Sequence, residues 1–276
     1  MPADGGRADQ RFCIYHPPHG PACRGALVYV HPLAEELNKT RRMAALQARA
    51  LAAAGWAVLQ IDLMGCGDSS GDFGDATWQA WVTDITRACE WLGHKHPPHP
   101  VEGGAQGGLW LWGLRAGCLL AADAGARLAQ ACNFLFWQPP VNGRSQLQQL
   151  LRLKLASGML GQQDKSTQAS LRQQLHAGQA LEVGGYRLSA ELASGLERAV
   201  LAPPARPVEG RRLVWLEVSA DVDSGFTAPQ EQALEAWRQA GFAVQARKVG
   251  GAAFWQTSEI EVNPFLTAST MESLSA

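Results

Sequence analysis

The sequence predicts an α/β protein with a mostly parallel central sheet and helices on both faces. Three observations indicate this class. Short apolar segments rich in aromatic and β-branched residues alternate with longer segments of helical periodicity. Short stretches containing Gly or Pro join them. Several apolar segments, such as GLWLWG at 108–113, suit strands that are buried on both sides. In such a sheet, ligands bind at the carboxyl ends of the strands.

The first elements are indicated by local patterns. Residues 11–16 and 25–31 are short apolar runs bounded by Pro and Gly, which is typical of strands. The next segment has apolar residues at helical spacing, and we expect a helix with Thr40 as its N-cap and Gly55 as its end. The apolar run at 57–61 predicts the next buried strand.

The same alternation continues to the C-terminal third. Further helices are expected at 78–92, 116–128 and 229–240, and further strands at 108–113, 132–137, 212–218 and 242–249. Residues 145–206 interrupt the order and are rich in Leu, Gln and Ala, which predicts a helical cap or lid. The expected organisation is therefore a flexible N-terminus (1–10), a core (11–144 and 207–276) and this cap (145–206).

Composition excludes several function classes. The 276 residues include 24 Lys+Arg and 25 Asp+Glu, and a formal net charge of −1 disfavours a nucleic-acid partner. No segment approaches the ~18 uninterrupted apolar residues of a transmembrane helix, and the polar start lacks the apolar stretch of a signal peptide. We therefore expect a soluble cytoplasmic protein.

No metal site or cofactor is predicted. The six cysteines form no C-x-x-C pair. His94, His96 and His99 lie together in a Pro-rich stretch, but no carboxylate or cysteine beside them completes a set of ligands.

The segment 108–128 has the pattern of a nucleophile elbow: an apolar strand, then Gly113-Leu114-Arg115-Ala116-Gly117, then a helix of small residues. The central position is Arg115, which stays protonated and cannot act as an acyl-accepting nucleophile. Two interpretations remain open. Arg115 could bind an anion together with backbone N–H groups at the helix N-terminus. It could instead pair with a nearby acid, such as Glu35 or Glu36, and fill the site.

From about residue 11 onward, the chain resembles proteins of the α/β-hydrolase fold. The run His31–Met43 (HPLAEELNKTRRM) resembles the second type of exosortase A system-associated hydrolases, which occur in bacteria with exopolysaccharide and PEP-CTERM protein-sorting genes. The D-x-x-G-x-G-x-S run Asp62–Ser69, the Trp81/Asp84 helix and the Gly113–Gly117 elbow also match. The resemblance implies that the N–H groups of Leu33 and Ala116 form an oxyanion hole, and that Asp221 or Asp223 stands at the acid position.

The same resemblance exposes two departures. A hydrolase of this fold carries its catalytic histidine on the loop after the last strand. Here that loop reads Gly250-Gly251-Ala252-Ala253-Phe254-Trp255, and no histidine occurs after His176. The chain therefore lacks both the elbow serine and the histidine, and losing either typically costs about 10⁴–10⁶ in turnover.

Other candidate nucleophiles have simpler explanations. Gly67–Gly71 matches G-x-S-x-G, but no helix of small residues comes after Ser69 or Ser70. Cys118 lies inside the predicted helix. Cys66 is in a loop at a strand end and could form a Cys–His pair with His31, although a small residue in a tight loop is the simpler interpretation. His31 could instead bind a substrate oxygen or fix its own turn.

The residues support two candidate functions. One is an acyl esterase, thioesterase or acyltransferase with a non-standard nucleophile. The other is a degenerate hydrolase, a pseudoenzyme that binds a small acyl or anionic ligand through Arg115 or serves as partner to another enzyme of its pathway. Trp137 and Trp255 are expected near the crevice, where an aromatic pocket would suit an acyl chain. The residues favour the second function, and whether the chain is an enzyme stays open.

Overall fold

The computed structural model describes residues 9–20, 22–97, 108–159, 167–205 and 210–275. Residues 1–8 of the predicted N-terminal segment 1–10 lie outside the described residues, and so does His99. The strands are β1 (Cys13–His16), β2 (Gly25–Val30), β3 (Trp56–Ile61), β4 (Leu109–Leu114), β5 (Asn133–Trp137), β6 (Leu181–Val183), β7 (Tyr186–Leu188), β8 (Arg212–Val218) and β9 (Ala243–Val249). The helices are α1 (Glu35–Ala53), α2 (Trp78–Lys95), α3 (Ala116–Arg127), α4 (Gly143–Met159), α5 (Gln168–His176), α6 (Ala190–Arg198), α7 (Ala228–Gln239) and α8 (Pro264–Ser275), with a short 3₁₀ helix at Phe73–Asp75.

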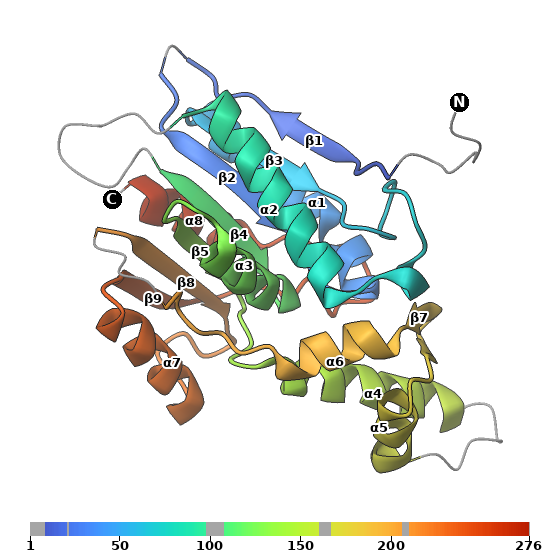
Figure 1. Ribbon diagram of the computed structural model, residues 1–276. Coiled ribbons are helices and arrows are strands. Elements are labelled where there is room, and N and C mark those ends of the chain that lie inside the picture. The colour runs from blue at the N-terminus through green and yellow to red at the C-terminus, as the bar shows by residue number, and fades with distance from the viewer. Residues whose placement is uncertain (1–8, 21, 98–107, 160–166, 206–209, 276) are drawn as a thin grey trace, which may run out of the picture.

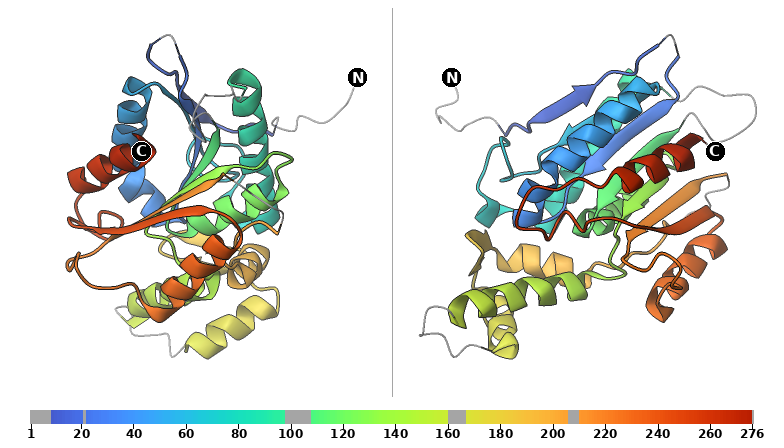
Figure 2. Two further views of the ribbon diagram at one scale, coloured as in Figure 1. Left: turned by 90° about the vertical axis from the view of Figure 1, so that its left-hand side faces the viewer. Right: turned by 180° about the vertical axis from the view of Figure 1, so that it is seen from behind.

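A seven-stranded sheet forms the centre, in the order β1-β3-β2-β4-β5-β8-β9. Strand β1 runs antiparallel to β3, and the other neighbouring strands are parallel. The predicted α/β class with a mostly parallel sheet is therefore confirmed. Figure 2 shows α1 and α8 on one face of the sheet and α2 and α3 on the other.

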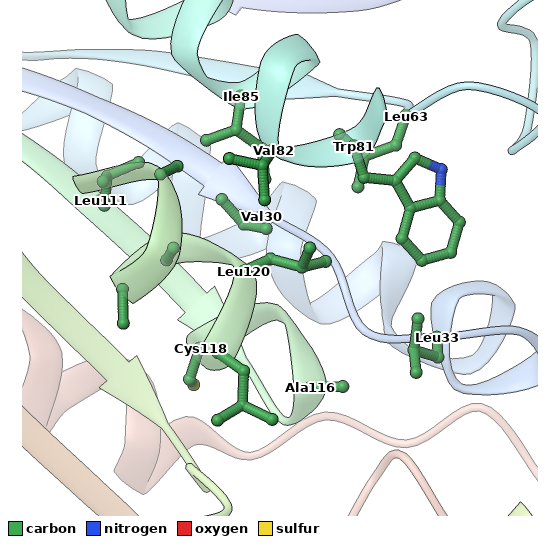
Figure 3. Packing of buried hydrophobic residues seen from close by; sticks show 14 of the residues in the cluster. Val30, Leu33, Leu63, Trp81, Val82, Ile85, Leu111, Ala116, Cys118 and Leu120 are labelled. Atoms are coloured by element: carbon green, nitrogen blue, oxygen red, sulfur yellow. The ribbon is translucent and has the colours of Figure 1, made fainter. Parts of the chain in front are cut away.

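The strands bury both faces because their side chains alternate. In β2, Val28 and Val30 join the core under α2, α3 and α7, whereas Leu27 and Tyr29 join the core under α1 and α8. Figure 3 shows part of the first core, where Val82 and Ile85 of α2 pack over Val30. This two-sided burial explains the near-continuous apolar runs of the sequence.

The helical segment between β5 and β8 lies across the carboxyl ends of the strands (Figure 1). It consists of α4, α5 and α6 with a small β6-β7 hairpin, and these five elements are called the cap. The hairpin turns at Gly184 and Gly185, both at positive φ (56° and 83°). The two glycines therefore form a hairpin turn inside a segment for which the sequence predicts only helices.

Helix α1 begins earlier than predicted. Its N-cap is Ala34, at φ 51°, and Thr40 is a buried residue inside the helix. The Thr40 hydroxyl donates to the carbonyl of Glu36 (2.8 Å), one turn back, so the expectation of an N-cap at Thr40 was wrong. The earlier start brings Glu35 and Glu36 into the first helical turn. This turn lies at the carboxyl ends of the strands, where the site is predicted.

Within the described ranges, no helix combines the length and the apolar character that crossing a membrane requires.

Candidate functional site

The elbow at Arg115 has the strained geometry that the glycine pattern indicates. Arg115 lies between β4 and α3 at φ 55° and ψ −127°, an uncommon conformation for a residue with a side chain. Its N–H donates to the carbonyl of Trp137 (2.9 Å) and its carbonyl accepts from the N–H of Cys118 (2.9 Å). These bonds hold the turn in place and fix where the side chain starts.

Glycine is required on both sides of the elbow by close packing. A Cβ atom at Gly117 would lie 2.7 Å from the carbonyl oxygen of His31, and one at Gly113 would lie 2.6 Å from the Cα atom of Cys118. Helix α3 therefore begins directly against the chain that comes after β2. This contact sets the elbow beside the loop that carries Leu33.

The Arg115 side chain is held by an acid, an amide and an aromatic ring. Its Nε and Nη2 donate to Oε1 of Glu36 (3.2 and 3.1 Å), and Nη2 also donates to Oε1 of Gln149 (2.7 Å). The guanidinium carbon lies 5.7 Å from the ring centre of Trp255. Only 8% of Arg115 is exposed. Of the two interpretations of Arg115, pairing with a nearby acid is the arrangement present, and the acid is Glu36.

Burial also affects Glu36. Desolvation raises the pKa of Glu36 more than the adjacent Arg115 guanidinium lowers it. Ionised Glu36 is therefore maintained at a cost, and the pair depends on both partners. Gln149 was missed by sequence reasoning because it comes from α4, far along the chain, and no spacing rule connects it to the elbow.

An aromatic residue of the loop after β9 contacts the guanidinium of Arg115. Trp255 lies in the loop after β9 and is buried, with its ring against Arg115. Trp137, expected near the crevice, instead belongs to the core under α1 and α8, where its Nε1 donates to the Thr270 hydroxyl (3.0 Å). Trp255 belongs to the same core, and the guanidinium of Arg115 lies over the Trp255 ring rather than over that of Trp137.

Asp221 and Asp223 lie in the exposed loop after β8. Oδ1 of Asp221 accepts from the N–H of Asp223 (3.2 Å), and the Ser219 hydroxyl donates to the carbonyl of Asp221 (2.7 Å). Among the described residues, no hydrogen bond or ion pair joins either aspartate to Arg115. Their role as a catalytic acid stays a prediction.

Leu33 and Ala116 come after two neighbouring strands, since β2 and β4 are paired. Both are buried, and Figure 3 shows them at the same end of the core, Leu33 on the loop after β2 and Ala116 in the first turn of α3. The N–H of Ala116 opens a helix and has no acceptor within it. The proposed oxyanion donors therefore lie near each other, beside the buried Arg115.

Cys66 and the serines of the Gly-rich loop serve the structure of that loop. Cys66 is buried, and burial raises the pKa of its thiol to about 12. The Ser69 hydroxyl donates to the carbonyl of Asp62 and accepts from the N–H of Phe12, while Ser70 bonds the backbone of Gln10. Cys118 is fully buried, and burial raises its pKa as well.

Both ring nitrogens of His31 form hydrogen bonds with the backbone. Nε2 accepts from the N–H of Leu63 (3.3 Å), which leaves Nδ1 to donate to the carbonyl of Pro32 (2.8 Å). The neutral ring therefore fixes the loops after β2 and β3, and burial lowers the pKa of His31.

This arrangement predicts that His31 makes stability depend on pH. The unfolded chain binds a proton near pH 6.5 and the folded chain binds it only at lower pH, so the contribution present at neutral pH is lost as pH falls below 6.5. We expect the free energy of unfolding to fall between about pH 7.5 and 5.5, and to fall less steeply in His31→Gln. Urea titrations at both pH values measure this. His19→Gln, at an exposed histidine, should keep the wild-type slope, and an unchanged slope in His31→Gln would contradict the assignment.

Comparison with known proteins identifies the architecture. The sequence matches no protein-family model and no curated protein. Among solved structures, it is similar to Est1E from Butyrivibrio proteoclasticus with bound ferulic acid, at 15% identity and a TM-score of 0.60 over 96% of this chain and 94% of that one. It is also similar to a thermostable carboxyl esterase from Bacillus coagulans in complex with glycerol (14% identity, TM-score 0.56, 88% and 86% covered).

A thermophilic esterase from Thermogutta terrifontis with bound malate is a third such structure, at 17% identity and a TM-score of 0.54 over 96% of this chain and 93% of that one. At these identities the likeness concerns the architecture. Together with the strand order and the elbow after β4, it shows that this chain has the α/β-hydrolase fold.

Proposed function

We propose that this protein does not hydrolyse esters and that Arg115 binds the carboxylate of a short acyl anion in the former catalytic crevice. The observation that carries the proposal is Arg115 itself: a permanent cation at the elbow, bonded to the carboxylate of Glu36. The Glu36 contact supports the view that this position accepts a carboxylate. Glu36 is in the first turn of α1 and would give way to a ligand by turning toward solvent.

The available space limits the ligand. A cavity of about 50 Å³ adjoins the ion pair, and Leu33, Ala34, Gln149, Leu150 and Tyr186 are among the residues that line it. Small-molecule sites usually measure about 300–1,000 Å³. The cavity therefore suits a short acyl chain of a few carbons.

The alternative is an esterase, thioesterase or acyltransferase with a relocated nucleophile. The structural similarity to carboxyl esterases favours it, since that fold often carries this chemistry. Against it stand the burial of Cys66 and its raised pKa, because the thiolate is the reactive form. The hydroxyls of Ser69 and Ser70 are occupied by backbone groups and do not pair with a histidine or carboxylate base.

The biological setting of the proposal rests on sequence resemblance. The run His31–Met43 resembles exosortase A system-associated hydrolases, so we place the protein with bacterial exopolysaccharide and PEP-CTERM sorting systems. In that setting, a non-hydrolytic protein would deliver or sense an acyl anion for an active enzyme.

Ester hydrolysis tests the first half of the proposal. Purified protein should release no p-nitrophenol above buffer from p-nitrophenyl acetate or p-nitrophenyl octanoate. Arg115→Ser should also be inactive, because a serine at the elbow still lacks a histidine base. Turnover by the native chain that survives Arg115→Ser and disappears in Cys66→Ala would instead establish a hydrolase.

Calorimetric titration with sodium butanoate tests the second half. We expect weak binding that is lost in Arg115→Met and tightened in Glu36→Gln, which removes the competing carboxylate. Glu235→Gln is the control, since Glu235 is an exposed residue of α7 and does not line this cavity. Equal affinity in all four proteins would refute a carboxylate site at Arg115.

A further inference from the structure

A second cavity lies between the core helices and the cap, away from the elbow. Its volume is about 780 Å³, and residues of α2 and α3 form one wall while residues of α5 and α6 form most of the other. Arg115, Glu36, Leu33 and Ala116 are not among its lining residues. The cavity is therefore separate from the former catalytic crevice, and its size falls in the usual range for small-molecule sites.

Close helix packing fixes the two walls. Gly195 of α6 lies directly on Trp78 of α2, and a Cβ atom at Gly195 would collide with the Trp78 side chain. Trp78 is in turn fixed to α3, since its Nε1 donates to Oδ2 of Asp123 (2.8 Å). The cavity is thus a built feature of the interface between core and cap.

Arginines reach the cavity from both walls. Arg127 of α3 is neutralised by Asp123 (2.9 Å) on the core wall. On the cap wall, the Glu197 carboxylate lies within ion-pair distance of both His176 (3.2 Å) and Arg172 (3.9 Å). Arg198 bonds the Ser194 hydroxyl, and no carboxylate of the described chain lies within ion-pair distance of it.

Arg172 also carries an unused donor. Its Nε–H is buried, and nothing in the described part of the chain accepts a hydrogen bond from it. A buried donor without an acceptor is costly, and a ligand oxygen would satisfy it. The distance from Nη2 of Arg172 to Oε1 of Glu197, 3.9 Å, is long for a charge-assisted hydrogen bond. The guanidinium of Arg172 therefore has a weak ion pair as well as an unpaired Nε–H.

We propose that this cavity binds an organic phosphate monoester, with the phosphate between Arg172 and Arg198 of the cap and Arg127 of the core. Guanidinium groups match phosphate oxygens, and three of them around one cavity suit a group with several acceptor oxygens. Apolar side chains of Trp78, Leu147 and Leu175 line the same space and would contact the organic part. Asp123, Glu191 and Glu197 also line it, so the ligand must compete with these carboxylates for the arginines.

Calorimetric titration of the purified protein with phenyl phosphate tests the proposal. One saturable site is expected at millimolar concentrations or below, weakened by added salt. Arg172→Gln and Arg198→Gln should each lower the affinity about tenfold or more. Arg238→Gln, at an exposed arginine of α7, should bind as the wild type does. Circular dichroism confirms that each variant is folded.

A variant that is expected to raise the affinity for phenyl phosphate makes the test more specific. Glu197→Gln removes the carboxylate that competes for Arg172, so it should raise the affinity several-fold. Arg115→Met should leave phenyl phosphate binding intact, which separates this site from the proposed carboxylate site at the elbow. The proposal fails if phenyl phosphate gives no saturable heat, if Arg172→Gln and Arg198→Gln bind as well as wild type, or if binding is lost in Arg115→Met.

Discussion

Replacing Glu36 by alanine is expected to lower the free energy of unfolding by about 3 kcal/mol, because it leaves a buried guanidinium without its carboxylate. Arg115 is 8% exposed, and its further partners among the described residues are the Gln149 amide and the face of Trp255. Neither carries a compensating charge. Urea unfolding followed by tryptophan fluorescence measures the change.

The neighbouring glutamate provides the control. Glu35 pairs with Lys39 at 3.4 Å, one helical turn along, and its side chain is 63% exposed. Such exposed pairs contribute about 0.5 kcal/mol or less, so Glu35→Ala should leave the free energy of unfolding almost unchanged. Equal effects of Glu35→Ala and Glu36→Ala would mean that the Arg115 pair does not stabilise the elbow.

The double variant Arg115→Met/Glu36→Leu shows whether the ion pair adds net stability to the fold. The other possibility is that only the loss of a single partner is destabilising, because it leaves a buried charge unpaired. Removing both charges also removes both desolvation costs, so its stability should lie within about 1 kcal/mol of wild type. The coupling energy between the two positions would then be large although the pair adds little overall. This result would indicate that Arg115 and Glu36 are kept for what Arg115 binds rather than for stability.

The sequence predicts the sheet well because each central strand carries its own signal. GLWLWG and CNFLFW are apolar on both faces and end at glycine or proline, so their strands were located to within a residue or two. Helix α1 was placed too late because its true N-cap, Ala34, gives no capping signal and adopts a positive φ. Helix α8 was missed entirely, because Pro264–Ser275 mixes apolar and hydroxyl residues without a clear helical stripe.

The site was predictable only where the backbone dictates it. Gly113 and Gly117 identify the elbow, since the turn leaves no room for a Cβ atom at either position. The identity of the residues around Arg115 depends on tertiary contacts. Glu36 was one of two acids within reach in sequence, but Gln149 reaches Arg115 from the cap, and no local pattern connects the two.

Truncating Trp112 is expected to have the largest effect on stability, about 4 kcal/mol for Trp112→Ala. Trp112 lies in β4, three residues before Arg115, and is fully buried in the core under α1 and α8. Its ring lies 4.5 Å from that of Tyr29 and 4.7 Å from that of Trp137, so three adjacent strands meet at this side chain. Removing it would leave a cavity that these rings cannot fill without moving the strands.

Trp91→Ala is the matched control, because Trp91 is 49% exposed on α2 and packs on Tyr15 at the edge of the sheet. Its loss should cost about 1 kcal/mol or less. If Trp112→Ala is no more destabilising than Trp91→Ala, the aromatic contacts across β2, β4 and β5 do not hold the sheet together. The strained turn at Arg115, which continues directly from β4, would then depend on its own contacts: the close packing at Gly113 and Gly117 and the backbone bonds of Arg115 to Trp137 and Cys118.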